Sequence, residues 1–390
     1  MAYDFDRVFD RVPTSSVKWS NSRLLGEGEG VLPLWVADMD FAAPPAVVDA
    51  IKARAEHPIY GYSLRSEDYY EAFIAWMKKR NGWIIEKDWI CSSPGVVPAL
   101  NLAVLAYSQP GDKVIVQTPV YYPFSLAVLN NGRQLAENRL ILDGGRYRMD
   151  LEGLEEKIDS RAKLLILCSP HNPVGRVWER GELEGLVEIC ARKGVVIVSD
   201  EIHSDLILGG RKHIPTASLS EAAAAITVTL TAPNKTFNIA GFAVANAIIP
   251  NARLRAAFSN QTANLGLGQT NVFGIVAQEA AYLKGEAWLE ELLRYLEGNF
   301  ARLSSFVAAR LPELTLLPLE GTYLAWIDFR KLGMSDAELM DFCWKKAKLW
   351  LDEGTKFGSG GSGFMRMNIA CPRSTLDEAL ARLEKAVRAR

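Results

Sequence analysis

This 390-residue chain contains few cysteines and few histidines, and its net charge is close to zero. The five cysteines are odd in number and scattered, without a Cys-x-x-Cys pair, so we expect neither a disulfide framework nor a metal or redox site built on them. The four histidines show no metal-ligand spacing. The formal net charge is −2 and both signs are interleaved, which argues against nucleic acid or an anionic membrane as a partner.

Long apolar runs are also missing. No segment approaches the length of a membrane span, and the first residues lack the apolar core of a signal peptide. We therefore expect a cytoplasmic protein whose partners are small molecules. The length allows a large hydrophobic core and about two domains.

Short β-rich runs alternate with helical patterns, which predicts an α/β fold with a mainly parallel sheet sandwiched by helices. The expected strands cover residues 89–92, 113–117, 164–168, 195–199, 226–230 and 243–249. One helix should begin after the N-cap Ser66 and end near Gly82, and another should cover 180–193. Ser335-Asp-Ala-Glu338 and Thr375-Leu-Asp-Glu378 each predict a capping box that opens a helix.

The sequence pattern changes after Gly285, where a long amphipathic run leads into further strands and helices. We expect an N-terminal arm over residues 1–45, a large cofactor-binding domain over 46–285 and a smaller C-terminal α/β domain over 286–390. The arm is expected to pack with the small domain.

Lys235 follows an apolar strand pattern and lies in an apolar turn that Gly241 bounds. Such surroundings disfavour the ammonium, so we expect a lowered pKa and a nitrogen that is nucleophilic toward aldehydes. The natural aldehyde is pyridoxal 5′-phosphate (PLP). A lysine alone is usually an ordinary surface residue, so this interpretation depends on the motifs that accompany it.

Three other motifs could surround such a cofactor. Asp200 ends a buried strand and could pair with a protonated pyridine nitrogen, although a helix cap is the alternative. Asn172 could donate to the pyridine hydroxyl, although Asn-Pro-x-Gly is also generic turn chemistry. Gly95, Val96 and Val97 open a helix whose free N–H groups could bind a phosphate, or they form a plain strand-to-helix turn.

In their order, these motifs resemble the fold-type I, aspartate-aminotransferase-like PLP enzymes, from about Val31 to the C-terminus. The likeness is carried by Gly95-Val-Val-Pro-Ala, Pro119-Val-Tyr121-Tyr122-Pro-Phe, Ser169-Pro-His-Asn172-Pro-Val-Gly-Arg, Ser199-Asp200-Glu-Ile-His203, Asn234-Lys235-Thr-Phe-Asn-Ile-Ala-Gly and Phe364-Met-Arg366-Met-Asn. The cystathionine β-lyase type carbon–sulfur lyases are most similar in Leu34-Trp35-Val-Ala37-Asp38-Met-Asp40-Phe, Tyr60-Gly-Tyr62 and Asp-Glu-Ile-His. An ordered set of this kind is stronger evidence of fold and cofactor than of reaction.

The resemblance implies that Lys235 anchors PLP and acts as the base. Tyr121 would stack on the pyridine ring and assist protonation of the leaving group, with Tyr122 as the competing choice. Arg366 would bind the substrate α-carboxylate through its planar fork, with Ala37 and Asn172 on the same side of the site. An arginine in a strand is otherwise more often a structural ion-pair partner. The glycine-rich stretch 358–363 before this strand is expected to move, or to be a flexible linker.

Other assignments also follow from the resemblance. Tyr60 would reach the phosphate of the neighbouring subunit, which implies a homodimer with shared active sites. His203 stands where aminotransferases carry a tyrosine, and Thr231 or Asn234 would replace the hydroxyls that usually hold the phosphate. Ala243 occupies the position of a phosphate-binding arginine, which suggests weaker retention of the cofactor.

We therefore expect a PLP-dependent carbon–sulfur β-lyase that converts L-cystathionine or a related cysteine S-conjugate to a thiol, pyruvate and ammonia. A class I/II aminotransferase shares all of these residues and is the alternative. A PLP-binding regulatory protein with little turnover is a second alternative, although no basic helix-turn-helix pattern supports binding to DNA. Cystathionine, cystine and alkyl-cysteines are equally compatible with the motifs.

Overall fold

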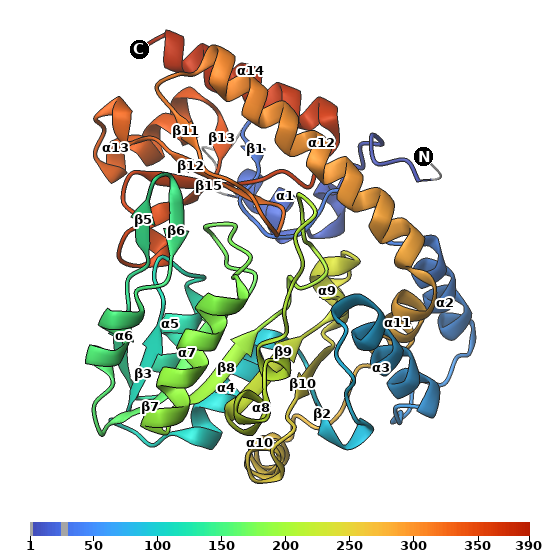
Figure 1. Cartoon of the computed structure of the whole chain (residues 1–390). Helices are drawn as coiled ribbons and strands as arrows, with labels where there is room; N and C mark the ends of the chain where they lie inside the picture. The colour runs from blue at the N-terminus through green and yellow to red at the C-terminus, as the bar shows by residue number, and fades with distance from the viewer. Residues whose placement is uncertain (1–2, 25–29) are drawn as a thin grey trace.

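The computed structural model describes residues 3–24 and 30–390, and its centre is a seven-stranded sheet with the order β2-β10-β9-β8-β7-β3-β4 (Figure 1). β10 is antiparallel to both of its neighbours, whereas β9, β8, β7, β3 and β4 pair in parallel. The predicted α/β class with a mainly parallel sheet is confirmed. The strands are β2 (Ile90–Ser93), β3 (Lys113–Val116), β4 (Gln134–Glu137), β7 (Ala162–Cys168), β8 (Val196–Asp200), β9 (Thr227–Thr231) and β10 (Ala245–Ile248).

Successive residues of the central strands enter two different cores, one on each face of the sheet. In β7, Leu164 and Ile166 join the apolar cluster that includes helix α4 (Val96–Tyr107). Leu165 and Leu167 join the cluster that includes helix α7 (Arg180–Lys193). A strand that is buried on both faces must be apolar at every position, which is why continuous apolar runs predicted these strands.

Further helices cover the large sheet and form its flank (Figure 1). Helix α11 packs against both α2 and α3, and α10 packs against α4. These helices are α2 (Pro45–Glu56), α3 (Glu67–Asn81), α5 (Pro123–Leu129), α6 (Leu151–Lys157), α8 (Glu221–Ile226), α10 (Ala252–Asn264) and α11 (Val272–Lys284).

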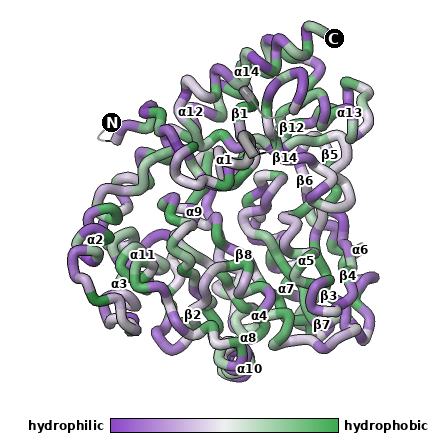
Figure 2. The backbone as a smooth tube through the Cα atoms, turned by 180° about the vertical axis from the view of Figure 1, so that it is seen from behind, coloured by the Kyte–Doolittle hydropathy of each residue, from purple (hydrophilic) through white to green (hydrophobic). Residues whose placement is uncertain are grey.

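The C-terminal part contains a second, four-stranded sheet with the order β11-β12-β15-β14, in which all pairs are antiparallel. Its strands are β11 (Thr315–Leu316), β12 (Leu324–Asp328), β14 (Asp352–Glu353) and β15 (Phe364–Asn368). The long helix α12 (Glu286–Arg310) packs along α14 (Arg373–Arg388), and the tube of α14 alternates between hydrophilic and hydrophobic colours in Figure 2. The N-terminal segment joins this part, because β1 (Leu32–Pro33) pairs in parallel with β13 (Leu349–Trp350).

Local capping patterns account for several of the helix ends. The Ser66 hydroxyl accepts from the Tyr69 N–H at the start of α3, and α3 ends at Gly82 with φ 65°. The capping box of Ser335 and Glu338 opens α13 (Asp336–Asp341), as predicted. The capping box predicted at Thr375 is wrong. Helix α14 already begins at Arg373 because Pro372, whose ring restricts φ, precedes it.

Two short structures in the large domain region were not predicted from the sequence. Strand β4 is a short edge strand, and β5 (Ile141–Asp143) forms an isolated hairpin with β6 (Arg146–Arg148). Both are short and lack a strong apolar pattern, so pairing with a neighbour rather than propensity decides their structure. Among the described residues, no helix is both long enough and apolar enough to cross a membrane.

The glycine-rich stretch 358–363 lies against the loop that precedes Tyr121. The Val120 N–H donates to the Phe357 carbonyl at 2.8 Å, and the hydroxyls of Thr118 and Ser359 are 2.7 Å apart. Within the stretch, the backbone of Gly361 packs so closely on Gly354 that a Cβ atom at Gly361 would lie 1.9 Å from the Gly354 carbonyl oxygen. Glycine at these two positions therefore permits backbone-to-backbone packing.

We expect Gly361→Ala to destabilise the protein by about 2 kcal/mol or more, because the added methyl group can be accommodated only by a shift of the backbone. Urea unfolding would measure the loss. Gly181→Ala is the matched control, since Gly181 lies in α7 with open space at its Cβ position, and it should be neutral or stabilising by up to about 1 kcal/mol. Equal stability of the two variants would contradict the packing argument.

Candidate active site

Three of the predicted site residues, Asn172, Asp200 and Lys235, lie at the carboxyl edge of the large sheet. Strand β8 ends at Asp200, β7 leads into the turn of Asn172, and β9 leads into the short helix α9 (Pro233–Thr236) that carries Lys235. Because these three strands are adjacent and parallel, their carboxyl ends meet at one edge. The fold therefore brings together residues that are far apart in the sequence.

Lys235 is half-buried, and its Nζ atom donates to the Ala37 carbonyl at 2.5 Å. Burial lowers the pKa of Lys235 to about 8, an effect that Asp38 and Asp200 oppose and Arg366 strengthens. This is the direction that the apolar turn predicted. A substantial fraction of neutral amine is therefore present near neutral pH.

Asp200 is buried, with 5% of its surface exposed, and its Oδ1 atom accepts from the Ile202 N–H at 3.1 Å. Burial raises the pKa of Asp200 to about 7, against the opposing effects of that hydrogen bond and of Lys235. No helix begins at Asp200, so the alternative role as a helix cap does not apply. A cationic partner beside this carboxylate would restore its charge.

Several buried polar atoms at this edge have no hydrogen-bond partner within the described residues, among them His203 Nδ1 and Asn234 Oδ1. Burial lowers the pKa of His203 to about 3, with Lys235 and Arg366 adding to the effect, so its imidazole is neutral. The ring packs edge-on against Tyr323. Buried polar groups without partners are costly, and here they match the needs of a polar heteroaromatic ligand.

Arg366 is buried on β15 and has three partners. Its Nη1 atom donates to Asn172 Oδ1 at 2.9 Å, and Nη2 donates to the Trp35 carbonyl at 2.7 Å and to Asp352 Oδ2 at 2.6 Å. The Nε atom is buried and has no partner in residues 3–24 and 30–390. The guanidinium lies over the Phe357 ring at 4.9 Å. A fixed guanidinium with a spare donor suits an incoming carboxylate.

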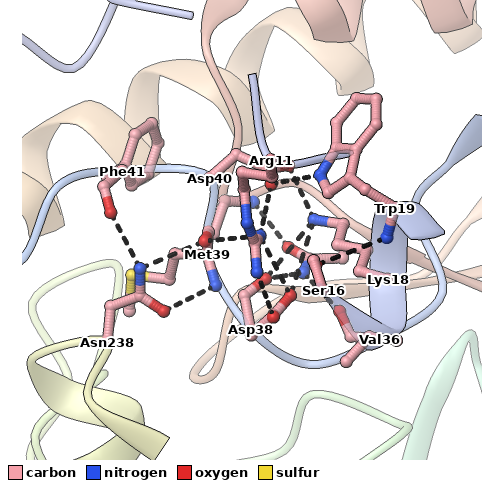
Figure 3. Close-up of polar contacts among 12 residues, drawn as sticks. Arg11, Ser16, Lys18, Trp19, Val36, Asp38, Met39, Asp40, Phe41 and Asn238 are labelled. Carbon is pink, nitrogen blue, oxygen red and sulfur yellow. Dashed lines mark hydrogen bonds and ion pairs between the residues drawn. The ribbon is translucent and has the colours of Figure 1, made fainter. Parts of the chain in front are cut away.

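Residues 35–41, which we call the strap, accept hydrogen bonds from both the lysine and the arginine. Figure 3 shows part of the strap with Asn238 and with residues of the N-terminal arm. Besides Lys235, the Tyr323 hydroxyl donates to the Ala37 carbonyl at 2.9 Å. Asn238 Nδ2 donates to the carbonyls of Met39 and Phe41, and Asn238 Oδ1 accepts from the Met39 N–H. Asn368, two residues after Arg366, donates to the strap as well, through the carbonyls of Val36 and Asp38.

Tyr121 and the helix start at Gly95 complete the set of residues near this edge. The Tyr121 N–H donates to the Asn172 carbonyl at 3.1 Å, and burial raises the pKa of Tyr121 to about 12. Gly95 is the N-cap of α4, Val96 is buried and Val97 is exposed. Thr231 is buried at the end of β9. Free N–H groups at the start of a helix attract anions in general, and α4, with 12 residues, begins directly after Gly95.

Tyr60 does not join these residues within its own chain. Its side chain is 55% exposed, its hydroxyl donates to the Ala55 carbonyl at 2.6 Å, and its ring lies beside Phe273.

Sequence reasoning missed two residues of this site. Asp352 faces Arg366 across the β14–β15 pair, and Tyr323 lies beside Ala37 and His203. Neither carries a local signal. An acid or a tyrosine next to a strand is common, and only the antiparallel register of the small sheet brings Asp352 to the arginine.

The sequence pattern of the family described as Aminotransferase class I and II matches residues 29–383. The chain belongs to this family. It is 47% identical over 385 residues to cystathionine beta-lyase PatB of Bacillus subtilis, covering 98% of this chain and 100% of that protein.

Two solved structures of the family are also similar to the chain. Cystalysin from Treponema denticola, which contains a pyridoxal 5′-phosphate cofactor, matches with a TM-score of 0.97 and 40% identity over 100% of both chains. The PLP-bound C-S lyase from Staphylococcus hominis matches with a TM-score of 0.91 and 34% identity over 98% of both chains. In the part of the chain that the structure describes, no group of three or more His, Cys, Asp or Glu side chains is arranged to hold a metal ion.

Lys235→Met should stabilise the protein in the absence of any ligand by about 1–3 kcal/mol below pH 8. The folded-state pKa of about 8 lies below the ordinary value of 10.5, so the folded protein carries a disfavoured ammonium below pH 8. This penalty disappears as pH rises from 8 to 10.5, where the unfolded lysine also loses its proton. The advantage of the variant should shrink over the same window.

Urea unfolding of the cofactor-free protein at several pH values would measure this difference. Lys78→Met, at an exposed position of α3, is the control and should show no such pH dependence. A constant difference between Lys235→Met and the wild type across pH 7 to 11 would refute the assignment.

Proposed function

We propose that this protein is a PLP-dependent carbon–sulfur β-lyase that cleaves L-cystathionine or a related cysteine S-conjugate to a thiol, pyruvate and ammonia. The observation that carries the proposal is that Lys235 and Arg366 both donate hydrogen bonds to the strap, beside the buried Asp200. A base and a carboxylate-binding fork are thus held together at the edge of the sheet. Close similarity over nearly the full length to proteins named as lyases favours elimination over transamination.

The residues present fit PLP. Lys235 would bind the aldehyde carbon, Asp200 the pyridine nitrogen, and Asn172 the ring oxygen through its Nδ2 group, because its Oδ1 is used by Arg366. The remaining cofactor contacts would come from Tyr121 and His203 at the ring and from Gly95, Val96, Val97, Thr231 and Asn234 at the phosphate. When bound, PLP supplies an electron sink for the charge that is left on the substrate Cα.

The protein's own groups then perform binding and proton transfer. Arg366 would orient the substrate carboxylate through its spare Nε donor, while Asp352 and the Trp35 carbonyl fix the plane of the guanidinium. The neutral amine of Lys235, favoured by burial, would remove the Cα proton. The hydroxyl of Tyr121, protonated at neutral pH with a pKa of about 12, would donate to the departing thiolate.

We further propose a cytoplasmic homodimer in which Tyr60 reaches the neighbouring site, with the arm and the two domains divided at about residues 45 and 285. Large apolar side chains are exposed in the segment that contains Tyr60, with Tyr62 at 97% and Leu64 at 93% exposure. An apolar group of this kind is typical of a protein–protein contact. A second copy would cover it.

Product analysis tests the reaction class. The protein with PLP should form pyruvate without a keto acid, together with a thiol from L-cystathionine or a persulfide from L-cystine, because elimination needs no second substrate. In parallel, an amino acid with 2-oxoglutarate should yield little glutamate. Lys235→Ala is the control and should form none of these products. Glutamate without pyruvate would establish an aminotransferase instead, and no turnover at all would favour the regulatory alternative.

Subunit mixing tests the shared site. Inactive Lys235→Ala and impaired Tyr60→Ala subunits, once exchanged, should regain activity above the sum of the parents, up to roughly a quarter of the wild type, because each heterodimer then holds one intact site. Lys235→Ala mixed with Arg366→Lys is the control. It should show no recovery, since both residues belong to one chain's site. Failure of the first mixture despite demonstrated exchange would place Tyr60 outside the neighbouring site.

A further inference from the structure

Two cations of the N-terminal arm meet two carboxylates of the strap in a compact network (Figure 3). Arg11 lies 2.6 Å from both Asp38 Oδ2 and Asp40 Oδ1. Lys18, whose side chain is fully buried, lies 2.6 Å from Asp40 Oδ2 and 3.9 Å from Asp38 Oδ1. The network is electrically balanced, and it joins the arm to the segment that touches Lys235.

The two carboxylates differ in how fully they are neutralised. Asp40 is buried and accepts from Lys18, Arg11 and the Trp19 indole N–H. Burial alone would raise the pKa of Asp40, but the charge of Lys18 and these hydrogen bonds outweigh burial and lower it. Asp38 is partly exposed and lies 2.6 Å from Arg11, whereas Lys18 is 3.9 Å away.

Asp38 is also the carboxylate next to the lysine contact. It directly follows Ala37, whose carbonyl accepts from Lys235 Nζ at 2.5 Å. Besides the strap, the charged and titratable groups that face Lys235 are Asp200 at the end of β8, the neutral His203 after β8, Arg366 on β15, and Tyr323 before β12, whose hydroxyl donates to the same Ala37 carbonyl. Two acids, Asp38 and Asp200, act on Lys235, and of these Asp38 is the one that pairs with a cation of the arm.

We propose that Asp38 and Arg11 act as a positioning pair for Lys235, in which the Asp38 carboxylate stabilises the lysine ammonium at the Ala37 carbonyl and Arg11 screens that carboxylate. The arm thereby sets how readily Lys235 releases its proton. The significance of this pair rests on the proposed role of Lys235 as the base. The pair itself is tested on the protonation of Lys235, which is independent of the reaction that the protein catalyses.

The two residues have opposite expected effects. Asp38 raises the pKa of Lys235, so Asp38→Asn should lower it. Arg11→Met leaves the Asp38 charge unscreened and should raise it. Each shift should amount to at least about half a pH unit, since a charge change within a poorly solvated site acts at an effective dielectric constant near 20. Arg11→Lys keeps the cation and should return the value toward that of the wild type.

Acetic anhydride labelling measures this pKa directly in the full-length, cofactor-free protein, because only the neutral amine reacts. Mass spectrometry of the peptide that contains Lys235 would follow labelling as a function of pH. Arg7→Met is the matched control, because it removes an equal charge from an exposed residue of the arm. The Arg7 guanidinium lies over the Phe9 ring. The acidic limb of the pH profile of kcat in the PLP-loaded enzyme should shift in the same directions, because Lys235 is a free amine only once the substrate has displaced it.

The double variant Asp38→Asn/Arg11→Met decides the mechanism. If Arg11 acts through Asp38, the double variant should match Asp38→Asn alone. A full Arg11 effect in the absence of Asp38 would overturn the proposal. An upward shift in Asp38→Asn would overturn it too, because disorder of the strap hydrates Lys235 and raises its pKa. If the protein lacks lyase turnover but the pKa of Lys235 falls in Asp38→Asn and rises in Arg11→Met as predicted, the proposed function is refuted and the positioning pair still holds.

Discussion

The candidate active site depends on one constraint, which is that a single short segment of backbone accepts hydrogen bonds from the two principal cations of the site. Lys235 reaches the Ala37 carbonyl and Arg366 reaches the Trp35 carbonyl, two residues apart on the strap. Asn238 and Asn368, close neighbours of those two cations in sequence, bind the same segment. The separation between Lys235 on the large sheet and Arg366 on the small sheet is therefore fixed by peptide geometry rather than by two flexible side chains.

Burial at this edge acts on three titratable groups at once. It lowers the pKa values of Lys235 and His203 and raises that of Asp200, so in the absence of a ligand each group is displaced toward its neutral form. A structure built only for stability would avoid such a combination, since it leaves polar groups poorly solvated. Sites that must exchange protons near neutral pH show this pattern.

Local sequence patterns predicted what local physics determines. The bounds of α7 follow from its amphipathic residues and from Gly194, and the strands of the large sheet follow from continuous apolar runs. Thr375 was misassigned because two starts compete within three residues, and the proline-led start at Arg373 prevails. The motifs around Lys235, Asp200, Asn172 and Arg366 were found because each follows or occupies a strong strand pattern.

What remained out of reach depends on contacts between distant segments. Lys18 lies in a polar stretch of sequence, yet its side chain is fully buried. The ion pair with Asp40, which is distant in the sequence, compensates the buried charge. Asp352 faces Arg366 only through the register of β14 and β15. Tyr60 lies apart from the site within one chain.

The three fixed partners of Arg366 have a consequence for affinity. A free arginine side chain loses roughly 2 kcal/mol of rotamer entropy when it is held in one conformation. Asp352, Asn172 and the Trp35 carbonyl already hold Arg366 as the chain folds, so an arriving carboxylate need not order it. The cost is met once, in folding, and the full enthalpy of the new hydrogen bond remains for recognition.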